Sequence, residues 1–272
     1  MALKEDRTNP ASLNEQTVLR FADAMHNAEI PAHKQLVLEM PEQPDDATCG
    51  PTCLHAVYQF HGDDIPLDQV IREVTHLETG GTLAVLLAIH ALRRGYRATT
   101  YAYNLRVFDP TWFQGKNIDI AARLRKQIEA KHDPRVRYTS ERYLEYLSLG
   151  GKLRFEDLTP ALIRRHLKRD LPILTGLSST YLYSCARESG VKQLSADDVG
   201  GEPVGHFVVL SGYDVVRRQV LVADPLQVDP DFRTQHYWVA MQRLLGAVLL
   251  GVLTYDGNLL VLEPPARLKG RP

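Results

Sequence analysis

The sequence predicts an α+β fold in which a helical first part precedes a sheet-forming second part. Apolar residues recur at helical spacing through most of the chain up to Asp170, and runs rich in valine, leucine and isoleucine follow it. One expected helix begins at a cysteine, and one expected strand begins near a histidine. Chains of this class commonly place a site between their two parts, where a cleft can form.

The length of 272 residues and the hydrophobic content of 44% are enough for one sizeable core or two lobes. We expect a helical N-terminal extension over residues 1–40, a single domain over 41–265 and a tail over 266–272. The helical part of this domain should run to about residue 170, and the sheet part should fill 171–265.

Local signals place the elements of the first part. Ser12 to Glu15 (SLNE) is a capping box before an amphipathic segment. Gly80-Gly81 is typical of a turn, and Gly95 of a helix C-cap. The sequence therefore predicts helices over 13–27, 49–61, 65–77, 82–95, 118–131, 140–149 and 159–169. It predicts strands over 34–40 and 96–103, with loops around 109–110 and 133–134.

The second part contains β-rich segments separated by turn residues. Turns are expected at 214–218 and 256–258, where Asp, Gly and Asn gather. The expected strands are 172–177, 206–213 and 219–223, with a final pair near 248–254 and 259–263.

Composition and charge exclude several classes of protein. The chain has 32 basic and 33 acidic residues, a net charge of −1, so nothing indicates a nucleic-acid partner. The densest basic groups, 123–126 and 164–169, have the spacing of solvent-facing sides of helices. The N-terminus lacks the apolar run of a signal peptide, and the longest apolar stretch, 244–253, is too short to span a bilayer. We expect a soluble cytoplasmic protein.

The most informative segment is 43–54, QPDDATCGPTCL, which places Cys49 at the start of a helix. Pro51 is tolerated only in a first helical turn, where its missing N–H would have no partner. Leu54 and Val57 then continue with helical spacing. Unpaired N–H groups and the helix dipole at such a position stabilise a thiolate. We therefore expect Cys49 to be a nucleophile.

The other two cysteines are Cys53 and Cys185. Three cysteines are too few, and odd in number, for a disulfide framework, which agrees with a reducing compartment. Cys49 and Cys53 are four residues apart, but no second Cys/His pair follows closely, so we expect no metal site and no cofactor. Cys53 and Cys185 are expected to pack as small apolar side chains.

A cysteine nucleophile needs a base, and the base needs an orienting group. Of the ten histidines, His206 has the best context, because it opens the run HFVVLSGYD and would project from the start of a strand. Asp224 ends the next strand, beyond a hairpin turn that brings the two residues within carboxylate–imidazole reach. Asp214 is a rival orienter, but it lies in the turn itself, where Asp is favoured for local hydrogen bonds.

These residues have separate expected roles. Cys49 would be the nucleophile, His206 the general base and acid, and Asp224 the group that orients the imidazole. Gln43 would donate an amide N–H to an oxyanion, beside the backbone N–H of Cys49. Taken singly, each residue has an ordinary structural explanation. Their occurrence together, in compatible contexts, favours catalysis.

Several segments resemble the family-39-like cysteine peptidases, whose best known members are bacteriocin-processing domains that cut after a double-glycine leader. The segments are 43–52, 81–96, 172–174, 205–210 and 223–225, and they span roughly half of the chain. The resemblance implies a papain-like fold, with a helical lobe carrying the cysteine helix and an antiparallel sheet lobe. It also implies a peptide or protein substrate and the roles given above.

Two features depart from that family's pattern. Its bacteriocin-processing members are commonly fused to a membrane transporter, whereas no transmembrane segment is expected here. The helical span 104–169 is also longer than a minimal domain requires. This span would form either one rim of the cleft or scaffold.

The sequence leaves three functions open. The first is hydrolysis of a peptide or related amide bond through an acyl-enzyme. The second is acyl transfer by the same residues, as in transglutaminase-like or phytochelatin-synthase-like enzymes, where an amine or thiol intercepts the acyl-enzyme. The third is a non-catalytic peptide-binding module, although such a module has no need for a thiol beside an imidazole. Hydrolysis is the expectation, because water is always available.

Overall fold

The structure is a computed structural model that describes residues 31–77, 80–115, 118–190, 195–226, 234–254 and 256–268. The expected helix over 13–27, most of the expected extension and the last four residues of the tail lie outside the described residues. Everything below concerns the described part of the chain.

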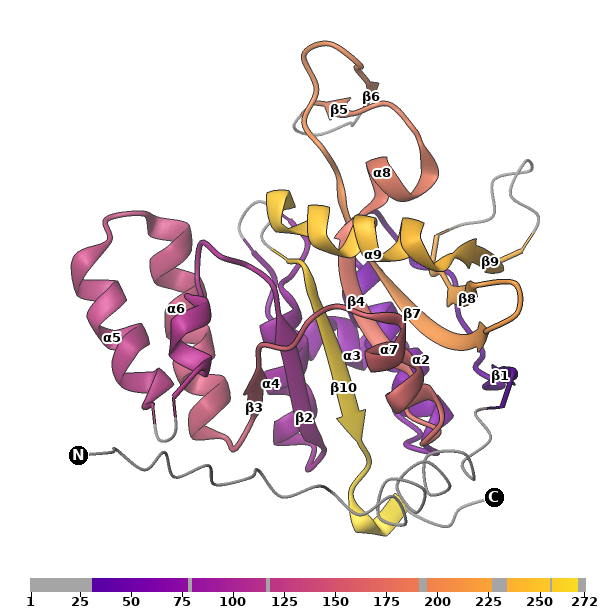
Figure 1. Cartoon of the computed structure of the whole chain (residues 1–272), viewed down its shortest axis with the longest axis horizontal. Coiled ribbons are helices and arrows are strands. Elements are labelled where there is room, and N and C mark those ends of the chain that lie inside the picture. Colours follow the sequence, from indigo (N-terminus) through magenta and orange to yellow (C-terminus); the bar gives the residue numbers. More distant parts are fainter. Residues whose placement is uncertain are drawn as a thin grey trace, which may run out of the picture. The chain divides into compact units, whose positions relative to one another are not determined.

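A single large sheet forms the centre of the described chain (Figure 1). Its strands run in the order β3, β2, β10, β4, β7, β8 and β9, and β1 also pairs with β7. All neighbours are antiparallel except β2 and β3. The strands are β1 (His33–Gln35), β2 (Arg97–Ala102), β3 (Lys152–Arg154), β4 (Ile173–Ser178), β7 (Gly205–Asp214), β8 (Gln219–Ala223), β9 (His236–Ala240) and β10 (Asn258–Glu263). A separate two-stranded sheet joins β5 (Glu188–Ser189) and β6 (Ser195–Ala196).

Helices cover both faces of the large sheet, which explains why its central strands are continuous apolar runs. In β7, Phe207 and Val209 belong to one hydrophobic cluster, and Val208 and Leu210 belong to the other. The first cluster packs against α2 (Cys49–Phe60), α3 (Leu67–Glu73), α4 (Ala84–Arg93), α5 (Ile120–Ala130) and α6 (Pro134–Ser148). The second packs against α7 (Pro160–Leu167), α8 (Ser179–Tyr183) and α9 (Met241–Leu250).

The α+β class and the helix that begins at Cys49 are confirmed. The sheet is less segregated than expected, because β1, β2 and β3 come from the first part of the chain. The parallel β2–β3 pair also means that the sheet is not wholly antiparallel.

The expected strand over 248–254 is wrong. The segment is the end of α9 followed by the 3₁₀ helix η2 (Gly251–Thr254). Leu244, Ala247 and Val248 are buried at helical spacing, so the apolar run fills one side of a helix. An unbroken apolar run does not distinguish the two element types by periodicity.

Two shorter corrections concern element boundaries. The strand expected over 34–40 pairs with a neighbour only at His33–Gln35. Leu36 and Leu38 stay buried while Val37 is exposed, so the alternation continues beyond the last residue paired with β7. The expected loop at 133–134 is the start of α6, where Asp133 caps the helix and Pro134 fills its first turn.

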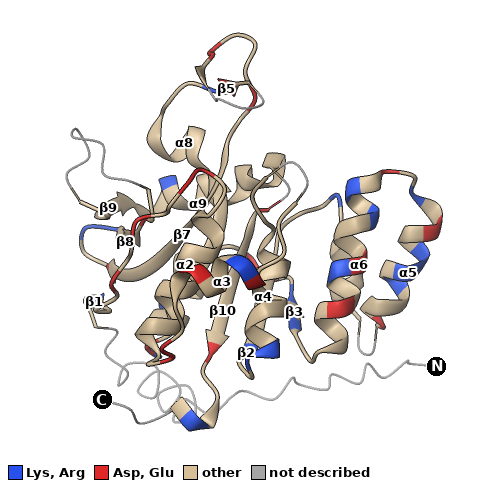
Figure 2. Cartoon of the chain, turned by 180° about the vertical axis from the view of Figure 1, so that it is seen from behind, with Lys and Arg blue, Asp and Glu red and all other residues tan. Residues whose placement is uncertain are grey.

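Charged residues are mixed in sign over α5 and α6 (Figure 2). In α5 the basic side chains at 123, 125 and 126 are exposed, whereas Leu124 and Gln127 are buried. The interpretation of this basic group as a solvent-facing side of a helix is confirmed. No helix in the described ranges is long and apolar enough to cross a membrane.

Candidate active site

Cys49 is the first residue of α2, and its side chain is buried. Thr48, the residue before it, makes no side-chain cap, and the first turn of the helix holds no acidic residue. The N–H groups of this turn therefore keep their positive field at the thiol. A thiolate at Cys49 receives that field without competition from a capping carboxylate.

The glycine after the cysteine is required by packing. A Cβ on Gly50 would lie 2.6 Å from Cγ2 of Thr82 and 3.2 Å from the ring of Phe207. The absence of a side chain lets the first turn of α2 rest directly on β7 and on the segment before α4. This contact holds Cys49 close to the strand that carries His206.

His206 and Asp224 lie next to each other, as the expected hairpin requires. Nε2 of His206 donates to Oδ1 of Asp224 at 2.9 Å, and both side chains are buried. The register of β7 and β8 pairs Leu210 with Val222. Because side chains alternate along a strand, His206 and Asp224 project to the same face as that pair.

Burial lowers the pKa of His206, but hydrogen bonds with Asp224 and Cys49 and the charges of both outweigh it and raise the pKa to about 10. Since Nε2 is bonded to Asp224, Nδ1 is the ring nitrogen left for the thiol. The imidazole thus lies between the cysteine and the carboxylate. The raised pKa of His206 favours a protonated imidazole beside Cys49.

Asp224 is held by more groups than the sequence suggested. Its Oδ2 accepts hydrogen bonds from the hydroxyls of Tyr183 and, at 2.6 Å, Tyr237. Its Oδ1 also accepts the backbone N–H of Leu226 at 3.0 Å. Burial raises the pKa of Asp224, but the hydrogen bonds from His206 and the two tyrosines lower it to about 2. The carboxylate therefore stays ionised.

Replacement of Tyr237 by phenylalanine should destabilise the fold. The change removes one donor from a buried carboxylate, which costs roughly 1–3 kcal/mol. Urea denaturation of Tyr237→Phe measures the loss, and Tyr181→Phe is the matched control because Tyr181 is exposed. Equal unfolding free energies for Tyr237→Phe and the parent would contradict this role.

Gln43 is buried near the start of α2, and its backbone N–H donates to the carbonyl of Pro225. Its side-chain Nε2 donates to the carbonyl of Asp45 at 2.9 Å, and Oε1 has no partner within the described ranges. An amide NH₂ carries two hydrogens, so one remains for an oxyanion. The hydrogen bond from Gln43 to Pro225 also connects the oxyanion candidate to the segment that follows β8 and carries Asp224.

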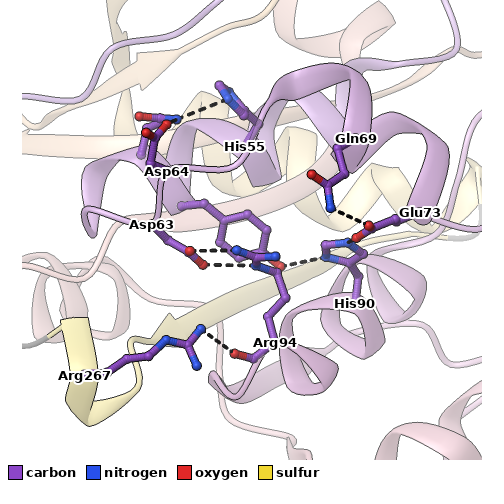
Figure 3. Close-up of polar contacts among 10 residues, drawn as sticks. His55, Asp63, Asp64, Gln69, Glu73, His90, Arg94 and Arg267 are labelled. Atoms are coloured by element: carbon purple, nitrogen blue, oxygen red, sulfur yellow. Dashed lines mark hydrogen bonds and ion pairs between the residues drawn. The ribbon is translucent and has the colours of Figure 1, made fainter.

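A polar network braces the other end of the cysteine helix (Figure 3). Tyr58 of α2 is hydrogen-bonded to Nδ1 of His90 at 2.9 Å, and Nε2 of His90 contacts Glu73 at 3.0 Å. The guanidinium of Arg94 makes a bidentate contact with the carboxylate of Asp63, from Nη2 to Oδ1 at 2.7 Å and from Nε to Oδ2 at 3.0 Å. These contacts fasten α2 to α3 and α4, which fixes the direction in which Cys49 faces.

A family model described as the Peptidase_C39 like family matches residues 28–244 of the sequence. The chain belongs to this family. It is accordingly a hydrolase of the cysteine peptidase class, and the resemblance proposed from the sequence is confirmed. The family is one of peptidases, and nothing in the comparisons supports the acyltransferase alternative.

Comparison with solved structures gives distant likenesses. A double glycine motif protease from an AMS/PCAT transporter, solved with its leader peptide, is 13% identical; the match covers 85% of this chain and 94% of that one, with a TM-score of 0.39. Xylellain, a cysteine protease from Xylella fastidiosa, is 14% identical over 87% of both chains, with a TM-score of 0.40. The peptidase domain of Streptococcus ComA is 14% identical over 84% of this chain and 98% of that one, with a TM-score of 0.39. No curated protein matches the sequence.

A cleft of about 200 Å³ opens beside Cys49 in this C39-like peptidase. One wall comes from α6, through Arg135, Tyr138 and Thr139. Part of the helical span 104–169, namely α6, therefore lines the cleft, a question that the sequence left undecided between rim and scaffold. The remaining lining comes from Asp46, from Leu77 and residues 80–83, from the start of β7 and from Thr254 and Asp256.

Asp256 is a buried carboxylate of the cleft to which the sequence analysis gave no role. It is 8% exposed, and its Oδ1 accepts hydrogen bonds from the N–H of Ala84 at 3.1 Å and from Asn258 at 3.3 Å. Gly176 leaves room for Asp256, because a Cβ added to this glycine would lie only 2.6 Å from the Cβ of Asp256. Burial raises the pKa of Asp256 to about 7, against the two hydrogen bonds, which lower it.

The raised pKa of Asp256 predicts a pH-dependent gain in stability for Asp256→Asn. The parent loses stability as pH rises from about 4 through 7, because its folded state must give up a proton that the unfolded state has already lost. Asparagine has no such proton, so the variant should gain up to about 4 kcal/mol on the parent over that range. Denaturation at pH 4, 6 and 8 measures it, with the exposed Asp46→Asn as the control. A gain that does not change with pH would contradict the prediction.

Cys53 and Cys185 differ from each other. Cys53 is buried, as expected, and its Sγ lies 3.2 Å from the carbonyl oxygen of Phe207. Cys185 is exposed, so the expectation that it packs as an apolar side chain is wrong. It follows the short helix α8, which the sequence analysis did not predict.

Within the described residues, no group of three or more His, Cys, Asp or Glu side chains is placed to hold a metal ion.

Proposed function

We propose that this cysteine peptidase cleaves a peptide or related amide bond through an acyl-enzyme on Cys49, with His206 as general base and acid and Asp224 as the orienting group. One observation supports it above all. His206 is hydrogen-bonded to Asp224 at 2.9 Å, interaction with Cys49 is among the causes that raise its pKa, and Cys49 begins a helix whose N-cap residue makes no side-chain cap. The peptidase domain would span residues 41–265.

The chemistry follows from that arrangement. Sγ of Cys49 attacks the carbonyl carbon, and His206 donates a proton from Nδ1 to the leaving amine as the amide C–N bond breaks. Neutral His206 then takes a proton from a water molecule, whose oxygen attacks the thioester, and the proton returns to the departing thiol. Asp224 holds the ring in orientation throughout and stabilises its positive charge.

The oxyanion formed in each step needs hydrogen-bond donors. The backbone N–H of Cys49 is free of intrahelical partners because it belongs to the first turn of α2. The second amide hydrogen of Gln43 is the other donor that we propose. Loss of one such donor typically slows acyl transfer by about 10²–10³-fold.

Trapping of the acyl-enzyme tests this mechanism. The p-nitrophenyl ester of acetyl-glycyl-glycine is a suitable probe, because glycine has no side chain that the cleft could reject. The parent should release p-nitrophenol in a rapid initial burst. After acid quenching, mass spectrometry should find the acetyl-glycyl-glycyl group on the peptide that contains Cys49. Cys53→Ala should behave like the parent, whereas Cys49→Ala should show neither signal. A burst that persists in Cys49→Ala would refute the mechanism.

A further inference from the structure

Asp256 is a buried carboxylate whose charge is not balanced by any cation among the residues that the structure describes. Its Oδ1 accepts two hydrogen bonds, whereas Oδ2 accepts none from the described residues. Only Ala84 and Asn258 act against the effect of burial on its pKa, and no lysine or arginine does. A charged group in this position costs stability unless something pairs with it.

The contact with α4 does not explain the charge. Asp256 caps this helix from a distant part of the chain, because Leu83 at the N-cap offers no side-chain acceptor. A cap needs only an acceptor oxygen, and asparagine or serine supplies one. The cap explains where the side chain lies but not why it is a carboxylate.

Two other charged residues line the cleft. Asp46, three residues before Cys49, is an exposed carboxylate that lines the same cleft. Arg135 of α6 also lines the cleft and is engaged in an interaction of its own. Neither contributes to the pKa of Asp256. The cleft thus presents two carboxylates to an incoming group, and Asp256 is the buried one of the two.

We propose that the cleft beside Cys49 binds a cationic group of the substrate, an ammonium or guanidinium, which pairs with Asp256. A cation there would supply the donor that Oδ2 lacks and would remove the cost of the buried charge. The proposal rests on the proposed function only in placing the reacting bond at Cys49. The cation belongs either to a lysine or arginine side chain or to the free N-terminus of a peptide.

Alkylation of Cys49 tests the pairing without any need for turnover. Two series of chloroacetamides are compared, N-(ω-aminoalkyl) and N-alkyl, with chains of two to six atoms. In the parent the cationic reagent should label Cys49 about tenfold faster than its neutral partner at one optimal length. In Asp256→Asn this ratio should fall to about twofold or less.

Asp46→Asn distinguishes a specific pair from a general negative field. This variant removes the same charge from the exposed wall of the cleft, where solvent screens it. It should change the ratio less than twofold. An equal loss in Asp46→Asn and Asp256→Asn, a ratio that Asp256→Asn leaves unchanged, or a parent without cation preference would each overturn the proposal.

Peptide substrates then identify the source of the cation. Peptides with lysine or norleucine at each of the two positions on either side of the scissile bond are compared, each with a free and an acetylated N-terminus. A lysine preference that survives acetylation assigns the side chain, and a preference that acetylation abolishes assigns the N-terminus. Failure to cleave any peptide would count against the proposed function, whereas the alkylation ratio would still decide the role of Asp256.

Discussion

Replacement of Cys49 by alanine should reduce peptide hydrolysis by roughly 10⁴-fold or more, because it removes the atom that forms the acyl-enzyme. The fold should tolerate the change, since the side chain is small and lies at the first turn of α2. Steady-state rates on a peptide that the parent cleaves measure the loss. Circular dichroism confirms that the variant is folded.

Cys53→Ala is the matched control for this prediction. Cys53 lies on the same helix and is fully buried, and burial raises its pKa well above the usual value, with smaller contributions from the charges of Cys49 and Asp224. A buried neutral thiol is not a nucleophile. Hydrolysis that survives in Cys49→Ala and disappears in Cys53→Ala would mean that the nucleophile has been misassigned.

Asp224→Asn should reduce hydrolysis by about 10²–10⁴-fold and move the alkaline limb of the pH profile to lower pH. Activity is lost as pH rises through the pKa of His206, because the imidazole must be protonated to donate to the leaving amine. The carboxylate is one of the groups that raise that pKa to about 10 against the effect of burial. Without its charge the pKa falls, and we expect the limb to move by at least about one unit.

Asp214→Asn is the control for Asp224→Asn, because Asp214 lies at the other end of the same hairpin. Its Oδ1 accepts the N–H of Arg217 in the turn, far along the strands from His206. Its replacement should leave both the rate and the pH profile within about twofold. An alkaline limb that stays in place in Asp224→Asn would contradict the role of this carboxylate.

The core of the site could be predicted from the sequence because its geometry is local. Pro51 fixes the start of α2 at Cys49, and a hairpin of two strands brings His206 to Asp224. Both relationships depend on short spacings and on turn chemistry. The proposed roles of these residues still await the experiments described above.

The groups around this core could not be predicted, because they depend on long-range pairing. Tyr237 lies on β9, and the pairing of β9 with β8 brings its hydroxyl to Asp224. Tyr183 lies in a five-residue helix, which is too short to show helical periodicity although Ser178 caps its start. Asp256 lies in what was expected to be an ordinary turn, and its distance in the chain from Ala84 hides the cap that it makes.

The apolar run of α9 shows a second limit of sequence patterns. Its residues pack on one face of the sheet, but Leu249 and Leu250 on the other side of the helix are exposed. A helix with apolar residues on both sides lacks the contrast that periodicity measures. The error at 248–254 follows from that missing contrast.

The pH dependence of Cys49 alkylation by iodoacetamide, followed by mass spectrometry in the parent and in His206→Ala, tests the central claim most directly. Cys185 is exposed and serves as the reference thiol within each sample, whereas Cys53 is buried. We predict that Cys49 in the parent reacts fast near neutral pH, well ahead of Cys185, and that His206→Ala abolishes this advantage. Labelling of Cys49 at the rate of Cys185 in both proteins would contradict an activated Cys49–His206 pair.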